Sequence, residues 1–382
     1  MTVLRVGLVG AGYMAKAHSL ALRAVTGFDW PQAPTFELVR VADLVPKAAE
    51  DVARRWRWAE PAADWRAITR AADIDVVDII TPNDTHAEIA IDALAHGKHV
   101  LCEKPMANDV AAGRAMLDAL NASGCQAVVN FVYRVWPAIE QAKRLIDQGA
   151  IGEIRLFDGH FFQDYALDPA MPYQWRHNRK VAGGGAFGDI GAHIGDIARY
   201  LVGDIRRVAA RSRRFTARRP KAVGSTDYVP VDVDDATMTL VEFASGAMGT
   251  IHASWAATGH KTDLGFTVIG ARGAIRFAWE RSNELQFFDQ ADAVDRGGFR
   301  TIILSGHHPG AEHFWFAPGQ GMGYGEAFVL VVRRLARAIV NGEPAAPSFE
   351  DGLRCLEFVD AANRAAESDR WVELERYEGA AR

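Results

Sequence analysis

The chain has 382 residues, more than one hydrophobic core usually supports, so its length predicts two domains. Apolar residues make up 49% of it and charged residues 24%, which is ordinary for a globular protein and excludes extensive disorder. The 43 basic and 48 acidic residues leave a net charge of −5. Because this balance gives no general attraction to nucleic acid or to an anionic membrane, neither is an expected partner.

Three cysteines, Cys102, Cys125 and Cys355, are too widely separated to form a disulfide framework or a Cys-x-x-Cys pair. We therefore expect reduced thiols and a soluble, cytoplasmic protein. Glycines at positions 7, 10 and 12 interrupt the N-terminal apolar run, which favours a strand and a turn over the alternative of a cleaved signal peptide. No segment reaches the roughly 18 uninterrupted apolar residues of a membrane-spanning helix.

The first 130 residues alternate short apolar runs with Ala-rich helical segments. Strands are expected at residues 3–9, 36–42, 76–80, 99–102 and 127–130. Helices are expected from just after Gly12 to about residue 25, at 46–56, from just after Asn83 to residue 96, and at 110–120. This order predicts right-handed βαβ units, and hence a doubly wound parallel sheet of the Rossmann type in a domain of residues 1–130.

From residue 131 onward the pattern changes to strands joined by short turns. They are expected at residues 235–243, 248–254, 264–269 and 274–277, with helices at 137–148, 327–340 and 350–366. Such strands predict an α+β domain over 131–382 with a large, mainly antiparallel open sheet, one face of which is covered by helices. We expect this domain to bind the substrate and to form a homo-oligomer, a dimer or tetramer, through its sheet.

The turn after the first strand reads Gly10-x-Gly12-x-x-Ala15, in which the second glycine lets the backbone approach a pyrophosphate. The helix that follows offers free N–H groups to the phosphates. Asp43 ends the second strand, where a carboxylate can bind ribose hydroxyls, although it lies 31 residues after Gly12 because of an apparent insertion at 27–35. These features predict NAD rather than NADP. A flavodoxin-like fold without a dinucleotide is the alternative.

Two further groups suggest chemistry. Lys104, in Glu103-Lys104-Pro105, follows a short strand at the edge where α/β sheets place ligands, although a surface lysine in a salt bridge is the commoner situation. Asp189 and His193 follow a run of glycines and are spaced i, i+4, so a helix would put both on one face, suited to proton transfer. The alternative is an N-cap aspartate and a partly buried helical histidine.

Together these residues resemble the Gfo/Idh/MocA family of oxidoreductases. The matching stretches are residues 7–12 with His18, 78–86, 97–106, Tyr133-Arg134 with Pro137, 149–152 and 183–196. The Glu-Lys-Pro and Asp-x-x-x-His elements in this order are specific, whereas the glycine turn is not. Residues 175–176 and 265–284 look most like the family's inositol and sugar dehydrogenases, of the scyllo-inositol or L-glucose type.

The resemblance implies that Lys104, Asp189 and His193 form the catalytic group. The expected cofactor site comprises Gly10, Gly12, Tyr13, Met14, Asp43, Thr81, Pro82, Asn83, His86, Glu103 and Lys104. The resemblance also implies that Arg176 reaches the substrate, and the expected substrate residues are Arg176, Tyr165, Trp175, Asp189 and His193.

We therefore expect NAD-dependent oxidation of a secondary hydroxyl on a cyclic polyol or sugar, with His193 or Lys104 taking the hydroxyl proton and the hydride passing to nicotinamide. Polar and aromatic side chains near the catalytic segment suit a neutral ring with many hydroxyls. One alternative is a glycosidase or epimerase that oxidises its substrate only transiently. Another is a non-catalytic sensor that binds NAD and a sugar.

Two segments could suggest other functions. His307, His308, Glu312 and His313 lack the helical i, i+4 histidine pair of a common metal motif, so we expect a loop and no metal. The basic stretch 206–221 could be a nucleic-acid arm, but it holds one stacking ring, Phe215, in an acidic protein. We interpret it as a solvated strand face or a subunit contact.

Overall fold

The structure is a computed structural model that describes residues 2–28, 30 and 33–375, and the chain divides into two compact units. Unit 1 is built from the residues up to Val135 together with Gly323–Leu353. Unit 2 is built from Trp136–Met322 and the residues from Arg354 onward. The compact units therefore differ from a division at residue 130, because a later segment of the chain joins unit 1.

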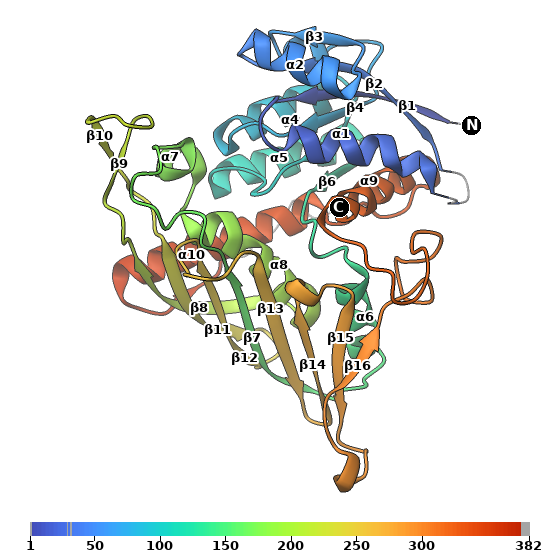
Figure 1. The fold of residues 1–382 in the computed structure, drawn as a ribbon, viewed down its shortest axis with the longest axis vertical. Coiled ribbons are helices and arrows are strands. Elements are labelled where there is room, and N and C mark those ends of the chain that lie inside the picture. The colour runs from blue at the N-terminus through green and yellow to red at the C-terminus, as the bar shows by residue number, and fades with distance from the viewer. Residues whose placement is uncertain (1, 29, 31–32, 376–382) are drawn as a thin grey trace. The chain divides into compact units, whose positions relative to one another are not determined.

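Unit 1 is built on a parallel sheet with helices packed on it (Figure 1). Its strands are β1 (Val3–Val9), β2 (Thr35–Ala42), β3 (Glu60–Ala62), β4 (Val76–Ile79), β5 (His99–Cys102) and β6 (Ala127–Val129). Their spatial order is β3-β2-β1-β4-β5-β6, and every neighbouring pair is parallel. This is the order of the dinucleotide-binding Rossmann fold, whose strand order reverses between β1 and β4.

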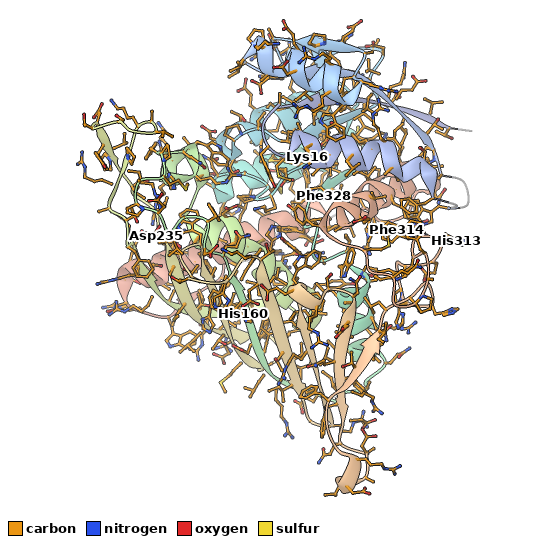
Figure 2. The ribbon with its side chains drawn as sticks, viewed as in Figure 1. Lys16, His160, Asp235, His313, Phe314 and Phe328 are labelled. Carbon is orange, nitrogen blue, oxygen red and sulfur yellow. The ribbon has the colours of Figure 1, made fainter. Side chains whose placement is uncertain are left out.

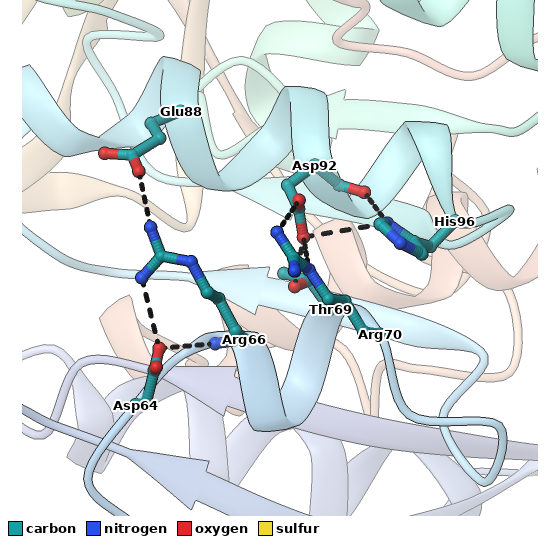
Figure 3. A network of polar contacts seen from close by, with 7 residues as sticks. All are labelled: Asp64, Arg66, Thr69, Arg70, Glu88, Asp92 and His96. Carbon is teal, nitrogen blue, oxygen red and sulfur yellow. Dashed lines mark hydrogen bonds and ion pairs between the residues drawn. The ribbon is translucent and has the colours of Figure 1, made fainter.

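Five helices connect the strands of unit 1. They are α1 (Ala15–Ala24), α2 (Pro46–Trp56), α3 (Arg66–Thr69), α4 (His86–Ala95) and α5 (Val110–Ser123). The short helix α3 is tied to α4 by surface ion pairs, drawn in Figure 3. Arg66 Nη2 lies 3.0 Å from Glu88 Oε1, and Arg70 Nη2 lies 2.8 Å from Asp92 Oδ1. Such exposed pairs are worth about 0–1 kcal/mol each, so they orient α3 rather than carry the stability of the unit.

Helix α9 (Tyr324–Asn341) belongs to unit 1 because its residues and those after it pack there. Phe328 of α9, labelled in Figure 2, contacts the His18 ring edge-on, with centroids 5.3 Å apart. The Val129 N–H of β6 donates to Pro347 O at 2.9 Å. Contacts between residues this distant in sequence leave no local pattern, which is why the periodicity alone places a boundary at residue 130.

Unit 2 holds a nine-stranded sheet in the order β16-β15-β14-β13-β7-β12-β11-β8-β17. The strands are β7 (Ile154–Phe162), β8 (Ile205–Arg213), β11 (Ala236–Phe243), β12 (Met248–Ser254), β13 (Asp263–Gly270), β14 (Gly273–Ala278), β15 (Glu284–Asp289), β16 (Arg300–Ile303) and β17 (Val372–Glu373). The β7–β12 pair is parallel and the other pairs are antiparallel. The predicted fold class is confirmed.

The remaining elements of unit 2 are one hairpin and several helices. The hairpin pairs β9 (Arg218–Pro220) with β10 (Tyr228–Pro230). The helices are α6 (Pro137–Asp147), α7 (Arg179–Ala182), α8 (Ala192–Val202) and α10 (Phe349–Ser368), of which α10 begins in unit 1. Among the described residues, none of the helices is both long enough and apolar enough to span a membrane.

The nine-stranded sheet has one buried and one open face. On β7, Phe157 and Phe161 are each 1% exposed, and α8 packs on this side. Side chains on the opposite face include five large apolar residues that stay well exposed: Leu156, Met238, Leu240, Met248 and Ile269. The strand register pairs Met248 with Leu156, and Leu156 with Ile269, so these three are neighbours.

Candidate active site

The glycine turn of unit 1 has the geometry of a pyrophosphate site. Gly10 has φ +108°, and a Cβ there would lie 2.9 Å from Ile80 Cγ1, so a side chain is excluded. A Cβ at Gly12 would meet nothing within 4 Å, which leaves open space beside the backbone. No side chain of the described residues caps α1, and its first turn holds no acid. The uncapped N-terminus of α1 therefore suits a phosphate.

Asp43 lies directly beside this turn. Its Oδ2 accepts the Ala11 N–H at 2.7 Å, and its Oδ1 accepts the Val45 N–H at 2.8 Å. The carboxylate thus connects the end of β2 to the glycine turn, where the adenosine ribose binds in a Rossmann fold. Leu44 follows it, is 87% exposed and offers no positive charge. Together the open turn, the uncapped helix and this acid fit NAD.

Asp43 should make the enzyme prefer NAD to NADP. Like charges ~4 Å apart near a protein surface repel by about 4 kcal/mol, and a 2′-phosphate would meet that repulsion here. We expect kcat/KM to favour NAD by at least ~10²-fold, and Asp43→Ser to reduce this ratio by about tenfold or more. Asp64→Ser, which removes an exposed acid of the same unit, serves as the control. A wild-type preference for NADP would refute the role given to Asp43.

The residues after β4 form the other side of the switch point. Thr81 and Pro82 are partly exposed, whereas Asn83 and His86 are buried. His86 Nε2 donates to Thr81 O at 2.8 Å, and its Nδ1 lies 3.1 Å from Pro105 O. Burial lowers the pKa of His86, so the ring is neutral. His86 therefore connects the Thr81 turn to the Glu103-Lys104-Pro105 segment and is not placed to carry a proton.

Glu103 and Lys104 follow β5 at the same carboxyl edge. Glu103 is 7% exposed, and its Oε2 accepts the main-chain N–H of Lys104 at 3.0 Å. Lys104 itself is partly exposed. The eleven residues expected at the cofactor site therefore all belong to unit 1, at or after the carboxyl ends of β1, β2, β4 and β5.

Asp189 lies in a π-helical turn (Phe187–Gly191) that leads directly into α8. The N-cap of this turn is Ala186, so Asp189 does not cap a helix. π-Helical turns are rare and are found frequently at functional sites. His193 follows in the first turn of α8, is 6% exposed, and its ring centroid lies 5.9 Å from that of Phe161.

Two of the expected substrate residues contact Asp189, and a third stacks on one of them. Tyr165 Oη donates to Asp189 Oδ2 at 3.4 Å, and Arg176 Nε lies 3.7 Å from the same oxygen. The Arg176 guanidinium stacks over Trp175, 4.4 Å from the ring centroid. Tyr165 is 43% exposed as a whole, but desolvation of its hydroxyl and the Asp189 charge raise its pKa, so the hydroxyl keeps its proton at neutral pH. Unit 2 thus gathers a carboxylate, a guanidinium, a phenol and a flat indole in one cluster.

Asp234 holds the glycine run in place, a role that the sequence analysis missed. The carboxylate, 6% exposed, accepts the N–H groups of Gly185 at 2.9 Å and Phe187 at 3.0 Å, and the Thr237 hydroxyl at 3.0 Å. A Cβ at Gly185 would lie 2.0 Å from Asp234 O, so this glycine serves close approach rather than flexibility. The acidic residues within 232–235 are visible in the sequence, but only the fold shows that Asp234 binds Gly185, 49 residues away.

Two other histidines of unit 2, His177 and His308, are less suited to proton transfer. Burial and the nearby Arg219 charge lower the pKa of His177 to about 4, so it is neutral in the physiological range. His308 of the 304–322 segment is bound by the Ser305 N–H at 3.0 Å. Among the described residues no group of three or more His, Cys, Asp or Glu is arranged to hold a metal ion.

The basic stretch 206–221 is used within the fold. It forms β8 and β9, and Arg207 pairs with Glu242 of β11. Arg219 is completely buried and donates to Ala166 O at 2.7 Å and to Asp168 O at 2.8 Å. Arg219 therefore anchors the loop that carries Tyr165.

Comparison with known proteins places this geometry in a class. Residues 4–131 match the oxidoreductase family with an NAD-binding Rossmann fold, and residues 139–276 match the GFO/IDH/MocA C-terminal domain. Levoglucosan dehydrogenase of Pseudarthrobacter phenanthrenivorans is 41% identical over 386 residues, covering 98% of this chain and 99% of its own. Inositol 2-dehydrogenase of Rhizobium meliloti is 31% identical over 375 residues, covering 98% and 100%.

Solved structures show the same similarity as the sequence comparison. A levoglucosan dehydrogenase in complex with NADH and L-sorbose matches with a TM-score of 0.96 at 41% identity, over 98% of this chain and 100% of its own. The fold and these matches define an oxidoreductase with an NAD-binding Rossmann domain. The chain belongs to the Gfo/Idh/MocA family. The predicted family, the NAD cofactor and the enzyme class, an NAD-dependent dehydrogenase, are confirmed.

Proposed function

We propose that this NAD-dependent dehydrogenase oxidises a secondary hydroxyl of a neutral, multiply hydroxylated ring, with levoglucosan or a similar anhydro sugar as the first substrate to test. Its relatives carry the names of sugar and polyol dehydrogenases, which does not favour the glycosidase, epimerase or sensor alternatives. Levoglucosan, on which the 41% identical relative acts by its name, carries secondary hydroxyls only.

The ion pair between Arg176 and Asp189 is the observation that carries the neutral-substrate part of this proposal. An unpaired arginine would attract a carboxylate bidentately, as in enzymes acting on hydroxy acids. Here Arg176 Nε lies 3.7 Å from Asp189 Oδ2, so the cluster has no net charge. Its donors and acceptors suit hydroxyl groups, while the Trp175 ring beneath Arg176 suits the C–H face of a sugar.

Within this proposal Lys104, Asp189 and His193 are the catalytic residues. Bound NAD supplies the hydride acceptor, so the chain has to hold the substrate and remove one proton. We assign the hydroxyl proton to His193 or Lys104, and the orientation of the hydroxyl to Asp189 and Lys104. Arg176 and Tyr165 both contact Asp189 Oδ2, and we assign them to the binding of neighbouring hydroxyls.

Initial rates of NADH formation test the substrate class. The panel sets levoglucosan, myo-inositol, scyllo-inositol and several aldoses against lactate, malate and a uronic acid. We expect a neutral ring to have the highest kcat/KM. Preference for an acid by more than about tenfold, roughly 1.4 kcal/mol of transition-state stabilisation, would overturn the proposal and make Arg176 a carboxylate clamp. Conversion of a sugar without NADH accumulation would favour the epimerase or glycosidase alternative.

We also propose a cytoplasmic homo-oligomer joined through the open face of the nine-stranded sheet. The exposed side chains Leu156, Met248 and Ile269 are neighbours on that face, and a contiguous exposed apolar patch marks an interaction surface. Cys102 and Cys355 are buried, which suits thiols in a reducing compartment. Sedimentation equilibrium tests the assembly, and a monomer at micromolar concentration would refute it.

A further inference from the structure

A buried polar network joins helix α1 to the catalytic edge of unit 1. His18 of α1 is 1% exposed, Asp78 of β4 is 0% and Glu103 is 7%. His18 Nδ1 lies 2.9 Å from both Asp78 oxygens, and His18 Nε2 lies 2.9 Å from Glu103 Oε1. Asn130, after β6, donates to the same Glu103 oxygen at 2.7 Å. The network therefore spans α1 and the ends of three neighbouring strands.

When Asp78 and Glu103 are both ionised, each ring nitrogen of His18 faces a carboxylate oxygen and must carry a proton. A neutral imidazole has one N–H, and its second nitrogen would face a carboxylate oxygen as acceptor against acceptor. Burial disfavours the cation, but Asp78 and Glu103 outweigh it and raise the pKa of His18 to about 10. Burial opposes ionisation of Glu103 as well, but His18 and Lys104 lower its pKa to about 2. Burial raises the pKa of Asp78 against the opposing charge of His18.

The equally buried His86 behaves differently because of its partners. It faces main-chain carbonyls instead of two carboxylates, and burial lowers its pKa. The charge on His18 is thus a consequence of its two acids and not of its depth. The Phe328 ring of α9 also contacts His18 edge-on, with centroids 5.3 Å apart.

Glu103 links His18 to Lys104. One oxygen of its carboxylate accepts hydrogen bonds from His18 and Asn130, and the other accepts the main-chain N–H of Lys104 at 3.0 Å. A protonated Glu103 could not accept at both oxygens equally, and rotation of the carboxyl group would release the Lys104 N–H. A displacement of about 1 Å at a reacting group can cost ~10²-fold in rate.

We propose that His18 is a positioning residue for Lys104, and that it acts by holding the Glu103 carboxylate between its ring and the Lys104 main-chain N–H. The inference rests on the proposed function, because it takes Lys104 as a catalytic residue. Asp78 holds the far side of the His18 ring and Asn130 supports Glu103. The network belongs to unit 1 and needs no contact from unit 2.

The test separates the charge of His18 from its space-filling role. His18→Gln combined with Asp78→Asn replaces the buried ion pair with two neutral amides, so no uncompensated acid is added. Without the cation, burial should raise the pKa of Glu103 above its ordinary value. We expect kcat relative to wild type to fall by about tenfold or more near pH ~6 and to recover at pH ~9, while the KM of the sugar changes less than about threefold. The kcat of Glu103→Gln should be low at both pH values, because glutamine cannot regain a carboxylate.

A second readout does not depend on the reaction. Hydrogen exchange at the Lys104 main-chain amide should be at least about tenfold faster in the double variant near pH ~6, where Glu103 is protonated. Lys98→Met is the matched control, because Lys98 lies at the other end of β5, is 9% exposed and donates to Ala71 O and Ile74 O. It should lower the melting temperature and leave the Lys104 amide and the pH profile unchanged.

The outcomes are distinguishable. Unchanged exchange at Lys104 in the double variant, or equal loss in Lys98→Met, overturns the positioning role whatever the substrate is. Faster exchange with an unchanged kcat keeps the contact but overturns the positioning role, because Lys104 then works normally without it, whereas the proposed function is tested separately by the substrate panel. The stability contribution of His18 should be full below pH ~6.5 and fade as pH rises toward ~10, since its pKa is raised on folding. The melting temperature of the wild type should therefore fall more steeply with rising pH than that of the double variant. If the two fall in parallel, His18 does not carry the proposed charge.

Discussion

Replacing Lys104 by methionine is expected to lower kcat by ~10²–10⁴-fold, the usual contribution of a general acid–base group. Methionine keeps the length and apolar stem of lysine while removing the ammonium, and Lys104 is only partly exposed. Stopped-flow and steady-state NADH formation at saturating NAD and substrate measure the loss. With the substrate deuterated at the reacting carbon, the isotope effect on kcat should be at least as large as in wild type, because the substitution slows the chemical step.

Lys104→Arg distinguishes proton transfer from charge. Arginine keeps the positive charge but does not lose its proton at accessible pH, so it should be nearly as slow as methionine if Lys104 moves a proton. Lys47→Met, which removes an exposed lysine of the same unit that pairs with Asp51, should retain full activity. Retention of more than roughly a tenth of wild-type kcat in Lys104→Met would contradict the assignment.

The Rossmann half could be predicted because its chemistry follows local rules. In a parallel sheet every carboxyl end lies at one edge, so Gly10, Asp43, Thr81 and Lys104 could be placed there from strand positions alone. The three-residue strand β3 could not be predicted from the sequence, because its pairing with β2 is set by tertiary contacts. The join of α9 to unit 1 escaped detection for the same reason.

Unit 2 shows where periodicity fails. The central strand β7 was not among the predicted strands, although it pairs with both β12 and β13. It carries Gly159, where a Cβ would meet Phe157 Cε1 at 2.6 Å, and its outward positions hold Asp158 and His160. A glycine and charged side chains inside a strand weaken the sequence signal, while the fold requires them for close packing and for the open face.

The same limit applies to the supporting residues of the active site. Asp189 and His193 could be proposed from their spacing, because i, i+4 residues share a face of an α-helix. The sequence does not predict the π-helical turn that contains Asp189. It also does not predict the hydrogen bond from the Gly185 N–H to Asp234, because the two residues are 49 positions apart. His18, Asp78 and Glu103 are separated by 60 and 85 residues, so their network became visible only in the folded chain.

His193→Gln is expected to lower kcat by ~10²–10⁴-fold, with little effect on folding. Glutamine fills similar space and keeps hydrogen-bonding groups, but it cannot accept and release a proton. His193 is 6% exposed in the first turn of α8, directly after the π-helical turn of Asp189. Turnover is measured by NADH formation, NAD affinity by fluorescence titration, and folding by the melting temperature. We expect the last two to stay near their wild-type values.

Two comparisons make this result specific to proton transfer. His252→Gln changes a histidine of β12 on the open face of the same unit and should leave turnover within about threefold of wild type. Asp189→Asn should also be slow, and the double variant with His193→Gln should be little slower than either single variant, because residues that act as one unit are not additive. Full additivity would show that Asp189 and His193 act independently. If His193→Gln keeps more than roughly a tenth of wild-type kcat, His193 does not accept the hydroxyl proton, and that role falls to Lys104.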